Sequence, residues 1–287
     1  MTMMINLHQY RVISVQGADA EKFLQGQLTC DVNGLADGQS TLTAHCDPKG
    51  KMNSVFRLIR ANAEQFYLLI RHALLPSALD NLKKYAVFSK VVFTEQDWQI
   101  IGVLDKQKCG AISADFSVTL PAPLNGVILL NQTAQDLVFT GTAEQWDLAE
   151  IQAGYPILSP ESQNEFIPQA LNLQCIEQAI SFQKGCYIGQ ETVARAKYRG
   201  INKRAMFTFN LETNEETAAQ IQLGSEIEMQ LENGWRKTGT ILSAVHFNGV
   251  LWLQVVLNNQ FEPNTEFRLV GNYAPLNLTP LPYNLTA

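Results

Sequence analysis

The last third of the chain constrains its fold most, because strand-like runs alternate there with hairpin signals. The runs cover residues 205–211, 225–231, 235–247, 250–257 and 266–270, and between them stand Glu232-Asn233-Gly234 and Asn248-Gly249. An Asn-Gly pair between alternating apolar runs is the strongest short-range signal for a β-hairpin. We therefore expect residues 205–287 to form a C-terminal antiparallel β-barrel, set off from residues 1–204 by a domain boundary.

Residues 1–204 mix strand and helix patterns, which predicts an α+β region. Asp47-Pro48-Lys49-Gly50 carries the residues that a type I turn prefers, so the runs on either side should pair as antiparallel strands. The sequence from Thr142 to Gln145 is a capping box, which predicts a helix through Gln152. Residues 87–94 are expected to form a strand, and residues 110–134 a weakly patterned connection. No G-x-G-x-x-G or Walker loop occurs, so a Rossmann or P-loop site is not expected.

One stretch concentrates chemically active side chains: Lys184-Gly185-Cys186-Tyr187-Ile188-Gly189-Gln190-Glu191. Its glycines allow a turn that holds the Cys186 thiol at a surface. Gln190 and Glu191 suit the first turn of a helix, whose last turn is basic and is followed by Gly200. A thiol just before a helix N-terminus is favoured as the thiolate. The alternative, at this point still open, is an inert buried cysteine on an architectural turn.

Positive charge is local in this chain. A net charge of -6 and a pI near 5.3 argue against a surface that coats nucleic acid generally. Residues 184–204, however, carry Glu191 as their one acidic side chain against six basic ones, which are Lys184, Arg195, Lys197, Arg199, Lys203 and Arg204. This window is either a solvated face or a local site for a polyanion or a carboxylate tail.

The cysteines are odd in number and form no C-x-x-C pair; they are Cys30, Cys46, Cys109, Cys175 and Cys186. This pattern argues against a disulfide framework and a zinc ribbon, so we expect no metal site and a cytoplasmic location. The N-terminal residues lack a basic segment followed by a long apolar core, and no run of about 18 apolar residues occurs. A membrane partner is therefore not expected.

With these motifs the chain resembles the YgfZ family of folate-binding proteins associated with tRNA modification, relatives of the aminomethyltransferase (T-protein) of the glycine cleavage system. The family signature K-G-C-Y-x-G-Q-E matches residues 184–191 at every fixed position. The resemblance extends over essentially the whole chain, through residues 17–27, 45–51, 83–90, 166–169 and 281–283.

The resemblance implies aminomethyltransferase-like folate-binding lobes around a central opening, closed by the C-terminal barrel. It implies tetrahydrofolate or a one-carbon derivative as the ligand. A folate-contacting tryptophan of the family falls at Trp146, and a second falls at Tyr10. The signature cysteine, on which family function depends, is Cys186, as a reactive or ligating thiol. The other expected ligand-site residues are Lys184, Gly185, Tyr187, Gly189, Gln190, Glu191, Arg195 and Arg199.

Family members are linked to the maintenance of iron–sulfur enzymes, including those that thiolate tRNA, and to control of replication initiation through tRNA modification. The expected function is therefore a tetrahydrofolate-binding accessory protein for iron–sulfur cluster assembly or repair, rather than an enzyme. Folate and iron–sulfur enzymes such as tRNA thiolation enzymes are the expected partners. Two alternatives stay open: a folate-dependent one-carbon (aminomethyl) transferase, and a non-enzymatic tRNA-binding protein that uses the basic window.

Overall fold

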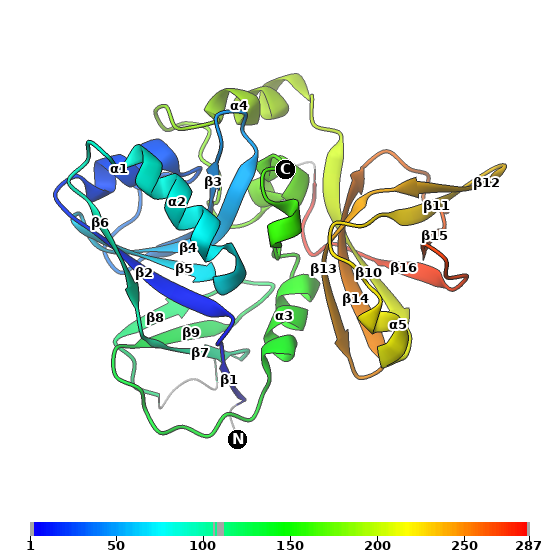
Figure 1. Ribbon diagram of the computed structural model, residues 1–287, viewed down its shortest axis with the longest axis horizontal. Coiled ribbons are helices and arrows are strands. Elements are labelled where there is room, and N and C mark those ends of the chain that lie inside the picture. Colours follow the sequence, from blue (N-terminus) through cyan, green and yellow to red (C-terminus); the bar gives the residue numbers. More distant parts are fainter. Residues whose placement is uncertain (1–2, 106, 108–111, 286–287) are drawn as a thin grey trace.

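The structure, a computed structural model, describes residues 3–105, 107 and 112–285. Within this part, two antiparallel sheets build the N-terminal half (Figure 1). The larger has the order β3 (Ser40–Cys46), β4 (Met52–Asn62), β5 (Gln65–Arg71), β2 (Tyr10–Gln16) and β6 (Val92–Gln96). The smaller has the order β1 (Met4–Asn6), β7 (Gln99–Val103), β9 (Val127–Asn131) and β8 (Phe116–Thr119).

A third antiparallel sheet forms the C-terminal lobe, at the right of Figure 1. Its order is β12 (Gly234–Thr238), β11 (Ile227–Leu231), β15 (Phe267–Leu269), β16 (Pro275–Thr279), β10 (Arg204–Glu212), β14 (Val250–Asn258) and β13 (Thr240–Phe247). The sheet curls, because Ile241 accepts a hydrogen bond from Gly224 (2.8 Å) and donates one to Ser225 (2.8 Å), just before β11. The run expected at 235–247 is two strands, since Gly239 turns the chain with a φ of 64°.

The helices are α1 (Ala20–Gln27), α2 (Leu75–Tyr85), α3 (Ala143–Gln152), α4 (Gln190–Arg199) and the short α5 (Glu215–Ala219). Single 3₁₀ turns cover His72–Leu74, Pro160–Ser162, Pro168–Leu171 and Leu173–Cys175. The predicted capping box of α3 is confirmed: the Thr142 hydroxyl accepts from the Gln145 N–H, and the side-chain oxygen Oε1 of Gln145 accepts from the Thr142 N–H. No helix of the described residues is long and apolar enough to cross a membrane.

In the N-terminal half, two expected segments differ from the structure. The strand expected at 87–94 begins only at Val92, because residues 86–91 turn the chain and the Lys90 N–H is bound by the Asp19 carboxylate (2.8 Å). The expected connection at 110–134 contains β8 and β9. All five residues of β9 are buried, and a strand buried on both faces shows no alternation in sequence. Residues 108–111, which include Cys109, lie outside the described part.

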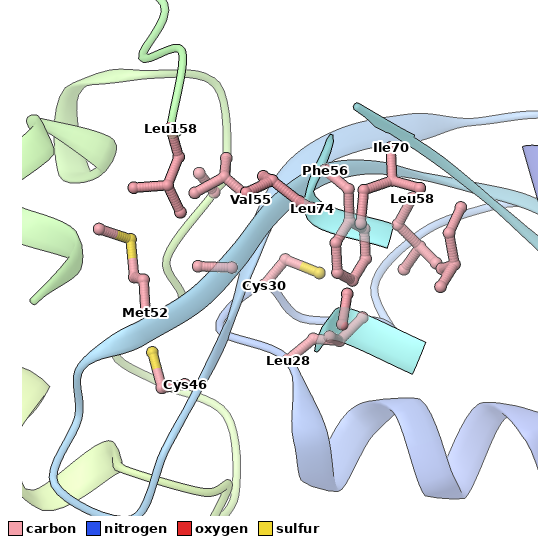
Figure 2. Close-up of a cluster of buried hydrophobic side chains, with 14 of the residues drawn as sticks. Leu28, Cys30, Cys46, Met52, Val55, Phe56, Leu58, Ile70, Leu74 and Leu158 are labelled. Atoms are coloured by element: carbon pink, nitrogen blue, oxygen red, sulfur yellow. The ribbon is translucent and has the colours of Figure 1, made fainter. Parts of the chain in front are cut away.

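A large apolar core fills the space between the five-stranded sheet and helices α1 and α2 (Figure 2). Cys30 and Cys46 lie inside it among leucine, valine and phenylalanine side chains. The four described cysteines are free thiols, and Cys186 is the exposed member. A second core, which includes Tyr10 and Trp146, joins the two N-terminal sheets to α3.

The C-terminal lobe is fastened to the rest through the connector that follows α3. The Gln254 side chain, on β14, accepts from the Ile157 N–H (2.9 Å) and donates to the Tyr155 carbonyl (2.6 Å). The Tyr283 hydroxyl donates to the Gly154 carbonyl (2.8 Å). These bonds therefore join the C-terminal lobe to the N-terminal half through the connector. The division at residue 204, where β10 begins, stays a prediction.

Candidate functional site

The signature loop docks onto the β3–β4 turn through two glycines. Gly189, the N-cap residue of α4, has a φ of 81°, and a Cβ there would lie 2.6 Å from the Asp47 carbonyl oxygen and 2.8 Å from the Gly50 Cα. A Cβ on Gly50 would lie 2.7 Å from the Thr192 Cβ. Such distances are shorter than real Cβ atoms allow, so both backbones require glycine here. The turn and the loop therefore form one closely packed unit.

Lys184 points into the protein. Its ammonium donates to the Leu28 carbonyl (2.8 Å) and the Cys30 carbonyl (2.7 Å), at the C-terminal end of α1, and lies 5.0 Å from the centroid of the Tyr187 ring. Burial lowers the pKa of Lys184 to about 8. The side chain expected to meet a ligand's carboxylate thus satisfies two backbone acceptors in this structure, and its place in a ligand site stays a prediction.

Cys186 points to solvent, whereas Lys184 before it and Tyr187 after it point into the protein. Tyr187 is buried, and the neighbouring Ile188 N–H donates to the Gly26 carbonyl (3.2 Å), which fixes the loop against α1. Cys186 itself is exposed, and a Cβ on the preceding Gly185 would meet open space. The alternative of a buried core cysteine is therefore wrong, and the reactivity of this thiol stays a prediction. Thiol reactivity requires access, and the loop provides it.

Helix α4 follows the predicted charge pattern. It starts at Gln190 and ends before Gly200, which has a φ of 59°. Arg195 forms an exposed i,i+4 ion pair with Glu191, while Arg199 lies on the exposed last turn. The Gln190 side chain reaches back to the Gly185 carbonyl at 3.5 Å. An exposed pair of this kind contributes little to stability, so Arg195 remains available to a ligand.

Tyr10 and Trp146 lie deep in the protein. Trp146 is fully buried, its indole N–H donates to Glu150 (3.1 Å), and a Cβ on Gly102 would lie 2.5 Å from its ring. The Tyr10 hydroxyl donates to the same Glu150 oxygen (2.6 Å). A ligand would reach the Trp146 face only if neighbouring residues moved. Its role as a folate platform therefore stays a prediction.

Arg71 completes this buried network. Its guanidinium binds Asp147 through both carboxylate oxygens (2.8 and 3.1 Å), also donates to Glu150, and lies 4.9 Å from the Tyr10 ring centroid. Burial would lower the pKa of Arg71, but Tyr10, Glu150 and Asp147 raise it well above the usual value. Burial likewise raises the pKa of Tyr10. The network is a cluster of paired charges, in which Glu150 is buried and Arg71 and Asp147 are partly exposed.

A second buried ion pair lies across the same interior. Arg57 binds both oxygens of Glu177, at 2.5 and 3.0 Å, and Glu177 also accepts from the Tyr155 hydroxyl (2.9 Å) and the Leu42 N–H (2.9 Å). Burial would raise the pKa of Glu177, but Arg57 holds it below its usual value. Glu177 has a φ of 49°, a conformation that costs a non-glycine residue about 1–3 kcal/mol. Backbone strain of this kind clusters at functional sites.

The two networks line one enclosed cavity, with Tyr10, Arg57, Arg71, Glu150 and Tyr155 in its wall. The cavity measures about 40 Å³, which is room for a few waters. Arg57 also lines an open groove of about 450 Å³, whose wall includes Glu177, Ser40 and Thr119. Arg57 thus lines both the groove and the cavity, and Glu177 lines the groove.

The predicted site residues fall in two places. Residues 184–191 line neither the cavity nor the groove, and they lie near α4 at the top of Figure 1, whereas α3 with Trp146 lies lower in the centre. Sequence reasoning missed five residues of the interior: Arg57, Arg71, Glu150, Tyr155 and Glu177. One available signal was Arg57 inside the apolar run of β4, since a buried arginine needs an acidic partner.

Comparisons with known proteins agree with this architecture. Residues 2–104 match the model of the GCVT N-terminal domain, and residues 202–272 match that of the YgfZ β-barrel domain. The fold is similar to that in the crystal structure of glycine cleavage system aminomethyltransferase T from Bartonella henselae, with a TM-score of 0.70 and 14% identity over 98% of this chain and 86% of that chain. The expected aminomethyltransferase-like α+β fold with a C-terminal barrel region is thus confirmed.

Curated relatives align along nearly the full length. An uncharacterized protein of Haemophilus influenzae is 60% identical over 100% of both chains. The tRNA-modifying protein YgfZ of Photorhabdus laumondii is 38% identical, and that of Yersinia pseudotuberculosis is 41% identical, each over 98% of this chain and 92% of the relative. Since such identity spans the N-terminal half and the C-terminal lobe, the chain belongs to the YgfZ family.

Proposed function

We propose that this protein is a tetrahydrofolate-binding accessory factor for iron–sulfur enzymes that modify tRNA in the cytoplasm. The observation that carries the proposal is the interior between the two N-terminal sheets, where residues of two arginine–carboxylate clusters and two tyrosines line a cavity, and Arg57 also lines an open groove. Support for the tRNA connection comes from the relatives named tRNA-modifying protein YgfZ.

The chemistry of the groove suits a folate. A glutamate tail is an anion that Arg57 attracts, and a pterin carries N–H groups that Glu177 would accept in place of its present bonds from Arg57. The groove volume of about 450 Å³ lies within the roughly 300–1,000 Å³ of typical ligand pockets. The enclosed cavity is too small for a pterin, so deeper entry would require the Arg57–Glu177 pair to open. Arg57, Glu177 and Tyr155 are the residues that would hold the ligand.

Cys186 performs a separate task in this proposal. Its thiol is exposed on a loop that Lys184 and two glycines fix in place, away from the groove. Such a thiol is presented to another protein rather than to a ligand in the interior. A single thiolate does not hold a cluster alone, because clusters take four protein ligands. We therefore assign Cys186 to transient contact with a partner iron–sulfur enzyme.

Complementation tests the assignment. A deletion strain would be supplied with wild-type protein, Cys186→Ala or, as a matched control, Cys175→Ala, and its content of thiolated tRNA measured. We expect the control to restore thiolation and Cys186→Ala to leave it low at equal protein level. Full restoration by Cys186→Ala would remove the thiol from the proposed function.

The transferase alternative makes a different prediction. A one-carbon transferase would turn over a methylene donor with purified protein at saturating tetrahydrofolate. An accessory factor binds tetrahydrofolate without turnover. Detection of steady product formation that the Glu177→Gln variant abolishes would replace the accessory role with the transferase role.

A further inference from the structure

Strand β6 forms an open edge of the five-stranded sheet. At the opposite edge, β3 is covered: the Thr29 N–H donates to the Ala44 carbonyl (3.0 Å). The Leu42 N–H of β3 likewise donates to the Glu177 carboxylate (2.9 Å). Strand β6 pairs with β2 alone among the described residues, and Figure 1 shows it on the side away from the C-terminal lobe. An open edge presents backbone N–H and carbonyl groups that can pair with another chain.

The sequence of β6 does little to protect this edge. Natural edge strands are often protected by lysine, proline or a bulge. Strand β6, Val92-Phe93-Thr94-Glu95-Gln96, contains neither lysine nor proline, and its pairing with β2 is regular. Its one charged side chain, Glu95, forms an ion pair with Arg11 on β2 (3.5 Å). Since successive residues of a strand direct their backbone groups to opposite sides, about half of those in β6 face the open edge.

Three exposed apolar side chains stand at the beginning of this edge. Val87 is 72% exposed, Phe88 is 100% exposed, and Val92 is 64% exposed. The first two belong to the link between α2 and β6, and the third begins β6. Scattered exposed apolar residues are ordinary, whereas neighbouring ones mark interaction sites. We call Val87, Phe88 and Val92 the apolar cluster.

Hydrogen bonds hold the link between α2 and β6 in place. The Ser89 N–H donates to the Ala86 carbonyl (2.8 Å), which closes a turn with Phe88 at its corner. The Lys90 N–H donates to the Asp19 carboxylate (2.8 Å). The exposed ring is thus carried by an ordered backbone. A preorganised contact of this kind loses less conformational entropy when a partner binds.

The charge around the apolar cluster favours an acidic partner. Residues 83–94 contain three lysines, Lys83, Lys84 and Lys90, and no aspartate or glutamate. All three lysines are exposed. Asp80, one helical turn before Lys84 on α2, offsets only part of this charge. In a chain of net charge -6, such a local excess of cations attracts anionic groups.

From the open edge, the apolar cluster and the lysines together, we propose that β6 binds an extended acidic segment of a partner protein. The segment adds to the sheet as a further strand, so that its backbone pairs with the free groups of β6. Its apolar side chains cover Phe88 and Val92, and its carboxylates pair with the lysines. A lipid surface would leave the backbone groups of the edge unpaired, which favours a protein strand. The proposal goes beyond the function proposed above and depends on neither the folate groove nor Cys186.

Photocrosslinking in living cells tests this surface. The probe is the photoreactive amino acid p-benzoylphenylalanine, placed in the full-length protein at position 88. The matched control carries it at position 273 on the C-terminal lobe, where Tyr273 is 91% exposed. We expect position 88, but not position 273, to crosslink a partner protein. Mass spectrometry should place the crosslink in a segment of the partner that is rich in aspartate and glutamate.

Variants and hydrogen exchange test how the partner is held. Lys84→Glu combined with Lys90→Glu should lower the crosslink yield at least about tenfold, whereas Lys237→Glu, at an exposed position on β12, should not change it. With the probe moved to position 87, Phe88→Ser should also lower the yield, while the unfolding midpoint stays unchanged because the ring is fully exposed. In the purified crosslinked complex, backbone amides of β6 should exchange more slowly than in the free protein.

Several results would overturn the proposal. The first is a position 88 that crosslinks no more than position 273, and the second is a yield that charge reversal does not change. Crosslinks to a second copy of this chain alone would make the edge a homodimer contact, and crosslinks to lipid alone would make it a membrane contact. Unchanged exchange of the β6 amides in the complex would exclude the addition of a strand.

Discussion

Replacing Gly189 by alanine should undock the β3–β4 turn from the signature loop. At a φ of 81°, an alanine costs about 1–2 kcal/mol in backbone strain. The added Cβ would also lie 2.6 Å from the Asp47 carbonyl oxygen and 2.8 Å from the Gly50 Cα, which are backbone atoms that do not rotate away. Overpacking of this kind costs about 1–3 kcal/mol. We therefore expect Gly189→Ala to lower the free energy of unfolding by about 2–5 kcal/mol.

Variants at two other glycines separate the backbone strain from the close contacts of the added Cβ. Gly200, at the opposite end of α4, has a φ of 59°, but a Cβ there would meet nothing within 4 Å. Gly200→Ala should therefore cost only the strain, about 1–2 kcal/mol. Gly185 has open space and no positive φ, so Gly185→Ala should stay within about 0.5 kcal/mol of wild type. The difference in unfolding free energy between Gly189→Ala and Gly200→Ala measures the cost of the close contacts between the two backbones.

Urea unfolding supplies the free energies, and site-resolved thiol labelling shows where the structure opens. Cys46 lies next to the turn and is 1% exposed, so undocking should speed its labelling in Gly189→Ala but not in Gly200→Ala. Equal destabilisation by these two variants, with Cys46 equally protected, would refute the reasoning that the two backbones require glycine.

Three further predictions follow from buried groups. Arg71→Met should cost about 3–5 kcal/mol in unfolding free energy because it leaves Asp147 and Glu150 without their cation; Arg11→Met, which breaks an exposed pair with Glu95 in the same sheet, should cost at most about 1 kcal/mol. Burial lowers the pKa of His45 from 6.5 to about 4. The unfolded chain therefore takes up the proton first, so the contribution of His45 to stability is constant above pH 6.5 and falls by about 3 kcal/mol as the pH drops towards 4. His45→Gln should flatten this part of the curve in urea titrations. Lys184→Met leaves the Leu28 and Cys30 carbonyls without their ammonium donor and should cost about 1–3 kcal/mol, whereas Lys49→Met, at an exposed turn position, should have little effect on the unfolding midpoint.

Local signals explain which elements the sequence could predict. The capping box of α3, the glycine after α4 and the Asp47–Gly50 turn act within a few residues, and each appears where expected. Long-range effects explain the misses. Strand β9 is buried on both faces and so lacks alternation, while the strand expected from Val87 starts late because Asp19, far away in the chain, binds the Lys90 N–H.

In the candidate site, too, residues that are adjacent in sequence could be predicted, and residues brought together by the fold could not. The signature loop could be found because its residues are adjacent in sequence, and the structure confirms that its thiol is exposed. Arg57 and Glu177 are 120 positions apart, and no spacing rule connects them. The strained backbone of Glu177 is likewise set by its tertiary partners rather than by its neighbours. The interior network therefore required the fold.

Calorimetric titration with tetrahydrofolate tests most directly whether the interior groove binds the ligand and the thiol acts separately. Wild type and Cys186→Ala should bind tetrahydrofolate equally. Glu177→Gln, which keeps the side-chain shape but loses the carboxylate beside Arg57, should bind at least about tenfold more weakly. Unchanged affinity in Glu177→Gln, or lost affinity in Cys186→Ala, would contradict the account.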